Sequence, residues 1–224
     1  MISFIKSPLL LAAILLLTLN GWFAPVTSLA DDRPNFVIII GDDISWDDYG
    51  AYGHPHIQTP HIDQLAQNGI RFDLAFLTTS SCSPSRCSIM TGRYPHSTGA
   101  GELHQPLPAD QIIFPQLLQA AGYYTAASGK WHLGTAPRKH FDVITNGKPS
   151  GCEQWVSTLR KRTPNKPFFM WFASYDAHRS WSPNAIEKQH KTSDIVVPPY
   201  LPDTADTRSF SGQTSCCSNF KGRL

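Results

Sequence analysis

Two uninterrupted apolar runs stand out in the pattern of hydrophobic and polar residues along the chain. Residues 35–40 (NFVIII) and 168–173 (FFMWFA) lack the alternation of a strand with one wet face. Short β-branched or aromatic runs of this kind are typical of strands buried on both faces of a mostly parallel sheet. Residues 123–128 predict another short strand, and residues 70–77 alternate well enough to predict a fourth. The pattern therefore favours an α/β fold.

Helical signals lie between these predicted strands. A helix is expected at residues 59–69, where a Thr-Pro pair supplies the N-cap and first turn, an apolar stripe follows and a glycine ends the pattern. A second is expected at residues 114–121, with Leu117 and Leu118 facing inward and Gly122 after its last turn. The alternation of strands and helices is the order expected for a layered α/β core.

Polar residues follow three of the strands. These are Gly41-Asp42-Asp43, Gly129-Lys130-Trp131-His132 and Asp176-Ala177-His178. In open α/β sheets ligands bind beyond the carboxyl ends of the strands, so we expect these segments to build one site. Lys130 and His132 would point to the same side of an extended segment. The paired carboxylates suit a hard divalent cation such as Ca²⁺, although an acidic turn would show the same pair.

The stretch Ser81-Cys82-Ser83-Pro84-Ser85-Arg86 predicts the start of a helix that ends near Gly92. Ser83 is a suitable N-cap and Pro84 suits a first turn, which would place Cys82 at the mouth of the helix. A helix N-terminus favours anions, and Arg86 would add a guanidinium on the same face as Cys82. A capped surface helix with an incidental cysteine is the alternative interpretation.

Composition changes the picture chiefly at the N-terminus. The 224 residues, 41% hydrophobic and 11% aromatic, can bury a real core, whereas a net charge of +2 indicates no class of partner. Residues 1–30 resemble a secretory signal, with Lys6 before an apolar run and a small-residue cleavage site before Asp31. An uncleaved anchor is the alternative, but the run is short for a span. We expect an exported protein, periplasmic or secreted, without a stable membrane span after cleavage.

The chain has five cysteines, at positions 82, 87, 152, 216 and 217. In an exported protein an odd number leaves at least one unpaired, which fits a chemical modification of Cys82, and the pairing of the others stays open. The adjacent Cys216 and Cys217 give only weak support to a redox or metal-storage function, because the chain has no C-x-x-C pair. We find no internal repeat, low-complexity tract or nucleic-acid-binding module, and expect no nucleic-acid partner.

The residues from Cys82 to Gly92, with Pro84 and Arg86 at fixed offsets, resemble the signature of the type I sulfatases. In that family an enzyme oxidises the cysteine to Cα-formylglycine. The other polar segments occur in the sulfatase order, so the resemblance covers residues 34 to about 200. Residues 80–86 and Leu103-His104-Gln105 resemble the heparan N-sulfatase (sulfamidase) branch.

The resemblance implies the fold of the alkaline phosphatase superfamily, a large mixed, mostly parallel sheet flanked by helices. It implies that Asp42, Asp43 and residue 82 bind Ca²⁺, and that residue 82, as the formylglycine hydrate, is the nucleophile. Arg86 would steady that hydrate. The remaining implied site residues, which would bind the sulfate or protonate the leaving group, are Lys130, His132 and His178. The implied partners are a sulfated carbohydrate or other sulfate ester and a sulfatase-maturing enzyme.

Two further functions compete with a carbohydrate sulfatase acting on O- or N-sulfate. One is a phosphodiesterase or phosphonate hydrolase of the same superfamily, and the other is an inactive truncated fragment. The second rests on an expected division into residues 1–30 (signal), 31–208 (N-terminal part of the catalytic domain) and 209–224 (a tail without apolar periodicity, possibly frameshifted). We expect such a chain to lack a later Asp-Asn pair, to bind Ca²⁺ weakly and to be inactive.

Overall fold

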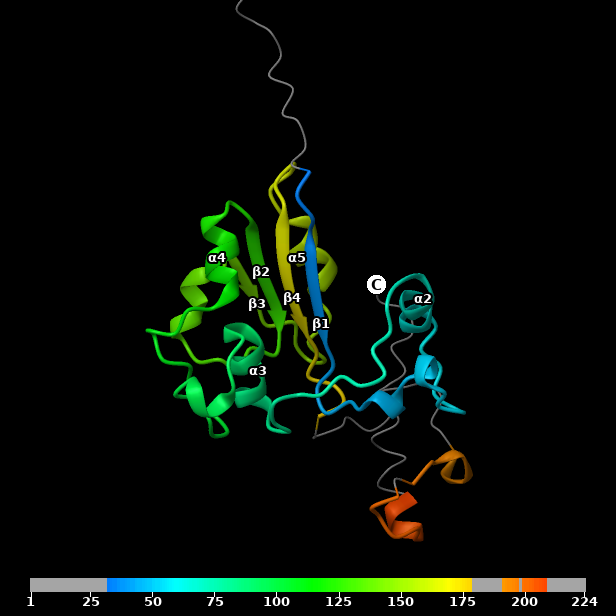
Figure 1. Cartoon of the computed structure of the whole chain (residues 1–224). Helices are drawn as coiled ribbons and strands as arrows, with labels where there is room; N and C mark the ends of the chain where they lie inside the picture. The colour runs from blue at the N-terminus through cyan, green and yellow to red at the C-terminus, as the bar shows by residue number, and fades with distance from the viewer. Residues whose placement is uncertain (1–31, 179–190, 198, 209–224) are drawn as a thin grey trace, which may run out of the picture. The chain divides into compact units, whose positions relative to one another are not determined.

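The computed structural model describes residues 32–178, 191–197 and 199–208. These residues form one four-stranded sheet in the order β1-β4-β2-β3, with all strands parallel (Figure 1). The strands are β1 (Phe36–Ile40), β2 (Tyr124–Gly129), β3 (Val143–Thr145) and β4 (Phe168–Ala173). The expected signal segment and tail, with Cys216 and Cys217, lie outside the described residues. Within the described ranges, no helix has the length and apolar character needed to cross a bilayer.

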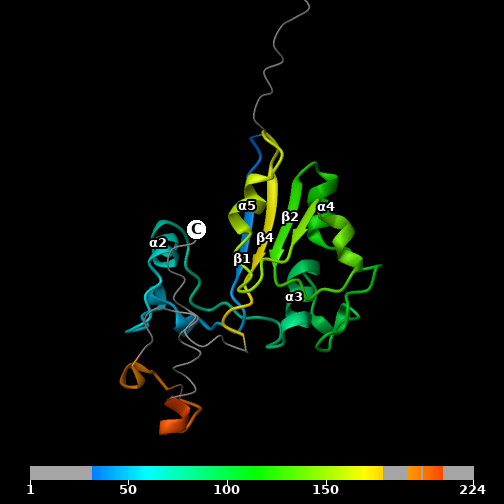
Figure 2. The same ribbon diagram turned by 180° about the vertical axis from the view of Figure 1, so that it is seen from behind.

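Helices lie on both faces of this sheet. The α-helices of the described residues are α2 (Pro60–Asn68), α3 (Cys82–Thr91), α4 (Phe114–Ala120) and α5 (Trp155–Arg160), and short 3-10 helices lie at Trp46–Asp48, Gly50–Tyr52, Pro95–Ser97, Ala136–His140 and Thr192–Asp194. Of these, α2 lies beside the sheet and not on a face of it (Figures 1 and 2). In Figures 1 and 2, α3 and α4 lie on one face of the sheet and α5 lies on the other. This is the layered arrangement of an α/β core, with right-handed connections expected between parallel strands.

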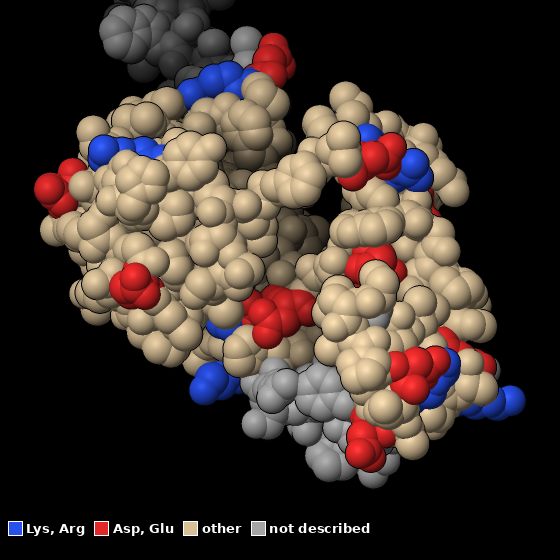
Figure 3. Space-filling model, turned by 60° about the horizontal axis from the view of Figure 1, so that its bottom comes forward, with Lys and Arg blue, Asp and Glu red and all other residues tan. Residues whose placement is uncertain are grey.

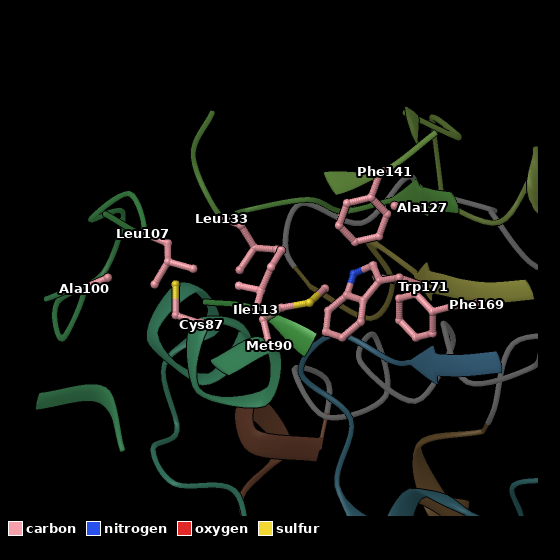
Figure 4. Packing of buried hydrophobic residues seen from close by; sticks show 11 residues of the cluster. Cys87, Met90, Ala100, Leu107, Ile113, Ala127, Leu133, Phe141, Phe169 and Trp171 are labelled. Carbon is pink, nitrogen blue, oxygen red and sulfur yellow. The ribbon is translucent and has the colours of Figure 1, made fainter. Parts of the chain in front are cut away.

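The side chains of β4 alternate between two apolar clusters. Phe169 and Trp171 belong to the larger cluster on the α3 and α4 face, where Cys87 and Met90 of α3 are completely buried. Figure 4 shows side chains from α3 and β4 directed into this cluster. On the other face, Phe172 stacks on Trp155 of α5, with ring centroids 5.3 Å apart. Fully burying one such side chain stabilises the fold by roughly 1.5–3 kcal/mol, so β4 anchors both layers.

The expected strands at both long apolar runs and at residues 123–128 are confirmed, as are the helices at residues 59–69 and 114–121. The strand expected at residues 70–77 is wrong, because that segment, which the structure describes, forms neither strand nor helix. Ile70, Leu74 and Phe76 are each more than 80% exposed. Alternating apolar residues become a strand only where a neighbouring strand satisfies the backbone and covers one face, and none of the described strands pairs with this segment.

Two burial predictions are also wrong. Strand β1 was expected to be buried on both faces, but it is an edge strand of the described sheet, with Val37 and Ile39 each nearly half exposed. In α4, Leu118 packs against the larger cluster while Leu117 is 59% exposed. A seven-residue helix buries one narrow stripe, and adjacent positions lie about 100° apart around it. Strand β3 and α5 were not predicted, because both are short and β3 is only half-buried.

Candidate active site

The carboxyl ends of β1, β2 and β4 are tied together by backbone hydrogen bonds. Lys130, after β2, donates its N–H to the carbonyl of Ala173 in β4 over 2.9 Å. Asp42, after β1, donates to Asp176 over 3.0 Å, and its carbonyl accepts from Ala177 over 2.7 Å. Figure 3 turns the lower side of Figure 1, where these strands end, toward the viewer and shows acidic and basic side chains close together there. The three loops are therefore held in one place by the backbone itself.

Gly129 makes the close approach of β2 to β4 possible. Its φ is +97°, and a Cβ at this position would lie 1.9 Å from the carbonyl oxygen of Ala173. No side chain fits there, and L-residues avoid this φ. The glycine before Lys130 is thus required by the sheet, and it directs the chain into the loop that carries Lys130 and His132.

Helix α3 presents Cys82 as its first residue. The N-cap is Ser81, with extended backbone, and Gly92 ends the helix in the left-handed region at φ +67°. The predicted helix and its end are confirmed, but Ser83 is not the N-cap. It lies inside the first turn, is 1% exposed, and its Oγ accepts the N–H of His104 over 2.7 Å. The two-residue shift arises because both Ser81 and Ser83 suit a cap, and the local sequence does not choose between them.

The centre of the site is a buried set of opposite charges. Asp42, 4% exposed, accepts hydrogen bonds from the Arg86 guanidinium at 3.3 Å and from the Lys130 ammonium group. Arg86, 3% exposed, also donates to the carbonyl of Lys130 over 2.9 Å. The Nζ of Lys130 lies 3.7 Å from the Cys82 sulfur. Two cations and one carboxylate leave a positive excess beside Cys82, which favours an anionic ligand.

Asp43 and His178 lie at the edge of this centre. Asp43 has a φ of +54°, and its carboxylate lies 3.9 Å from Nε2 of His178. One ligand atom each of Asp42, Cys82 and His178 fall within 4.8 Å of one another. The carboxylates fit a hard cation such as Ca²⁺, which prefers oxygen ligands, whereas a thiol at position 82 does not. An oxygen-bearing side chain at that position would add a donor of the kind that Ca²⁺ prefers.

His132 lies in the field of the same charges. Burial and then the charges of Lys130, His104 and Arg86 lower its pKa to about 4, while Asp42 acts in the opposite sense. Its Nε2 lies 2.7 Å from Nδ1 of His104. In the sequence, His104 contributes only to a family resemblance. Its contact with His132 was not predicted, because the two residues are 28 positions apart and no local spacing joins them.

The predicted site residues are thus placed unequally. The structure brings Asp42, Cys82, Arg86 and Lys130 into direct contact, and it places Asp43 and His178 against each other at their edge. His132 interacts electrostatically with that group, because the charges of Lys130, Arg86 and Asp42 affect its pKa. Their individual roles in a reaction stay predictions.

Comparison with known proteins gives this arrangement a context. A family model described as Sulfatase matches residues 34–150, just over half of the chain. The N-acetylglucosamine-6-O-sulfatase of Bacteroides thetaiotaomicron is 32% identical over 177 residues, covering 67% of this chain and 32% of that protein. Arylsulfatase A of Homo sapiens is 42% identical over 114 residues, covering 48% of this chain and 22% of that enzyme. The chain therefore spans about a third or less of these curated relatives.

Solved structures agree with the fold. A protein in complex with its substrate D-glucosamine-2-N,6-O-disulfate superposes with a TM-score of 0.62 at 33% identity, covering 67% of this chain and 36% of that one. A Bacteroides thetaiotaomicron structure from work on glycosaminoglycan metabolism gives a TM-score of 0.67 at 18% identity over 84% of this chain and 55% of that one. The second likeness concerns the fold alone. The expected α/β core of the sulfatase type is confirmed.

Proposed function

We propose that this chain, which belongs to the sulfatase family, a family of sulfuric ester hydrolases, carries the nucleophile side of a site that hydrolyses sulfate esters or sulfamates of a carbohydrate. The observation that supports this most directly is the position of Cys82. It is the first residue of α3, with the Lys130 ammonium 3.7 Å from its sulfur and Asp42 joining Lys130 to Arg86. A sulfate group is a compact anion, and this arrangement supplies fixed positive charge beside the attacking residue.

Residue 82 is proposed to act after oxidation to formylglycine by a maturing enzyme. The hydrated aldehyde supplies one oxygen to attack sulfur and a second whose proton can be removed to expel sulfate, so the covalent intermediate has an exit. A thiol offers neither function. The local structure supports the assignment, since position 82 is partly exposed, whereas Cys87 on the same helix is completely buried and burial raises the pKa of its thiol to about 11.

Asp42, Asp43 and the oxygen of a modified residue 82 are the groups proposed to hold Ca²⁺. The ion, when bound, would spread the negative charge of the sulfuryl group in transfer. The two carboxylates have different surroundings. The side chain of Asp42 is 5% exposed and fixed by two cations, while that of Asp43 is 58% exposed. Asp42 therefore supplies a rigid oxygen donor, and Asp43 a donor that is open to solvent.

The basic residues are proposed to hold the sulfate and assist the leaving group. Arg86 donates to the backbone and to Asp42, which fixes its guanidinium next to residue 82. Lys130 contacts both Asp42 and Cys82, so it can neutralise charge on an oxygen at position 82. Lys130, His132 and His178 are proposed to line the sulfate site, with Lys130 and His178 as donors to the sulfate oxygens or to the leaving group.

The substrate class is proposed from the relatives. One is named an N-acetylglucosamine-6-O-sulfatase, and a solved structure similar to the chain holds D-glucosamine-2-N,6-O-disulfate. Both substrates are sulfated amino sugars, so a sulfated carbohydrate of this type is the substrate we propose. A secretory signal at residues 1–30 would direct export of the protein to where such sulfated carbohydrates are found.

The decisive experiment is mass spectrometry of the tryptic peptide that contains residue 82, after co-expression with a sulfatase-maturing enzyme. We expect formylglycine in place of this cysteine. Trypsin cleaves after Arg86, so Cys87, which is buried and lies five residues further along the same helix, is in the next peptide and is expected to stay unmodified. Hydrolysis of an aryl sulfate is then compared with that of a phosphate diester. An unmodified Cys82, in cells that mature another sulfatase, would remove the proposed nucleophile, and a preference for the phosphate diester would remove the proposed reaction.

A further inference from the structure

A surface loop at residues 102–107 is fixed to both sides of the candidate site. Its middle is tied to α3, because the backbone N–H of His104 donates to Oγ of Ser83, the residue after Cys82. Its end is tied to the loop after β2, because Leu107 donates its N–H to the carbonyl of Leu133 over 3.1 Å. The backbone thus carries His104 from the Cys82 helix to the neighbourhood of His132.

The two imidazole rings meet in a direct hydrogen bond. Nδ1 of His104 and Nε2 of His132 are 2.7 Å apart, and the ring centroids are separated by 4.8 Å. Both residues have positive φ, +67° for His104 and +56° for His132, a backbone conformation that non-glycine residues seldom adopt. One of the two facing nitrogens must carry the shared proton, since two lone pairs at this distance repel and two N–H groups clash.

Burial decides which nitrogen carries it. Nδ1 of His132 is buried and has no hydrogen-bond partner among the described residues. The pKa of His132, lowered to about 4, keeps the ring neutral near neutral pH, with a single N–H. Either tautomer of His132 can keep the bond to His104, so the difference lies at the buried Nδ1: a proton there would be an N–H donor without an acceptor, which is rarer in proteins than an acceptor without a donor. The favoured tautomer of His132 therefore has its proton on Nε2 and a lone pair on Nδ1.

We propose that His104 is a positioning residue for His132: its Nδ1 accepts the Nε2 proton of His132, which fixes the ring orientation and leaves the lone pair of His132 on the buried Nδ1. The proposal rests on the proposed function only in assigning His132 to the sulfate site. The same relation holds in many sites where a second group sets the tautomer of a working histidine. Because the loop is also bonded to Ser83, His104 links the alignment of His132 to the helix that carries Cys82.

The test compares two substitutions that both tolerate the left-handed backbone. His104→Gly removes the ring, and His104→Asn keeps a polar oxygen near the position of Nδ1. His96→Asn is the matched control, because His96 is also exposed but stacks on Tyr94. The two-bond ¹H–¹⁵N spectrum of ¹⁵N-histidine-labelled full chain, with His132 assigned from a His132→Gln variant, reports which ring nitrogen is protonated.

We expect the native chain and the His96→Asn variant to show His132 with its proton on Nε2. The His104→Gly variant should lose the hydrogen bond to Nε2 of His132, seen as a shift of the His132 Nε2 resonance, and His104→Asn, whose Oδ1 can accept the same proton, should restore most of that shift. An unchanged His132 spectrum in folded His104→Gly protein would overturn the proposal, as would a native chain with the proton on Nδ1. The mass of the peptide that contains residue 82, measured in parallel, tests the proposed function separately, since an unmodified Cys82 with the expected spectra refutes the nucleophile and not the positioning.

Discussion

Replacing Asp42 with asparagine should strongly destabilise the protein, because Asp42 is the counter-ion of two buried cations. The side chains of Asp42, Arg86 and Lys130 are 5%, 4% and 11% exposed. The Asp42→Asn change keeps the shape but removes the negative charge, which leaves two cations together in a poorly hydrated place. Removing one partner of a buried ion pair costs about 3–5 kcal/mol. For a domain of this size, each kcal/mol lowers Tm by roughly 2–4 °C, so a fall of about 6–20 °C is expected.

The matched control is Asp43→Asn, one residue along the chain. The Asp43 side chain is 58% exposed and lies 3.9 Å from His178, itself 42% exposed. An exposed pair of this kind contributes about 1 kcal/mol or less, so Asp43→Asn should unfold within a few degrees of the native chain. Thermal unfolding of both variants, followed by circular dichroism in the same buffer, measures the difference. Equal Tm values for the two variants would refute the idea that the charges around Asp42 are buried and interdependent.

A double variant tests the cause of the destabilisation. Lys130→Met removes one of the two cations and keeps an apolar side chain of similar length. If repulsion between Arg86 and Lys130 is the cause, adding Lys130→Met to Asp42→Asn should cost much less than it costs in the native chain, or should raise Tm. Additive effects of the two substitutions would show that Asp42 and Lys130 do not interact.

Three further outcomes are expected. Gly129→Ala should prevent folding or lower Tm far more than Gly53→Ala does. Both glycines have φ near +95°, but only at Gly129 would a Cβ lie 1.9 Å from a carbonyl oxygen. Similar Tm values for both variants would contradict this. The pKa of His132 falls from 6.5 to about 4 on folding, so the folded state binds fewer protons, and the free energy of unfolding should decrease as the pH falls through this range. His132→Asn, followed by urea unfolding at several pH values, should lack this part of the decrease. In a full-length relative with the same loops, Lys130→Ala should reduce sulfate-ester turnover by roughly 10²-fold per folded molecule, measured below the Tm of the variant, and near-normal turnover would remove Lys130 from charge stabilisation.

The sequence by itself determined the layers of the core and the location of the site. An uninterrupted apolar run buries all its side chains only when both faces of the strand are covered, which is why β4 was predicted with the correct bounds. The carboxyl ends of parallel strands meet at one edge, so Asp42, Lys130 and His178 could be assigned to one site from their places after strands. The helix at Cys82 was predicted from its serines, its proline and the final glycine. These features depend on residues close together along the chain.

Only the tertiary structure decided which residues face one another across the chain. The strand order β1-β4-β2-β3, which makes β1 an edge, depends on pairings between segments up to more than a hundred residues apart, and no local pattern encodes them. The same holds for residues 70–77, whose alternation needs a neighbouring strand before it can become a strand. The salt bridges of Asp42 with Lys130 and Arg86 and the His104–His132 contact likewise arise from loop closure. The sequence gives each side chain its chemical type. Its contact partners, its burial and its pKa depend on distant segments that only the folded core brings together.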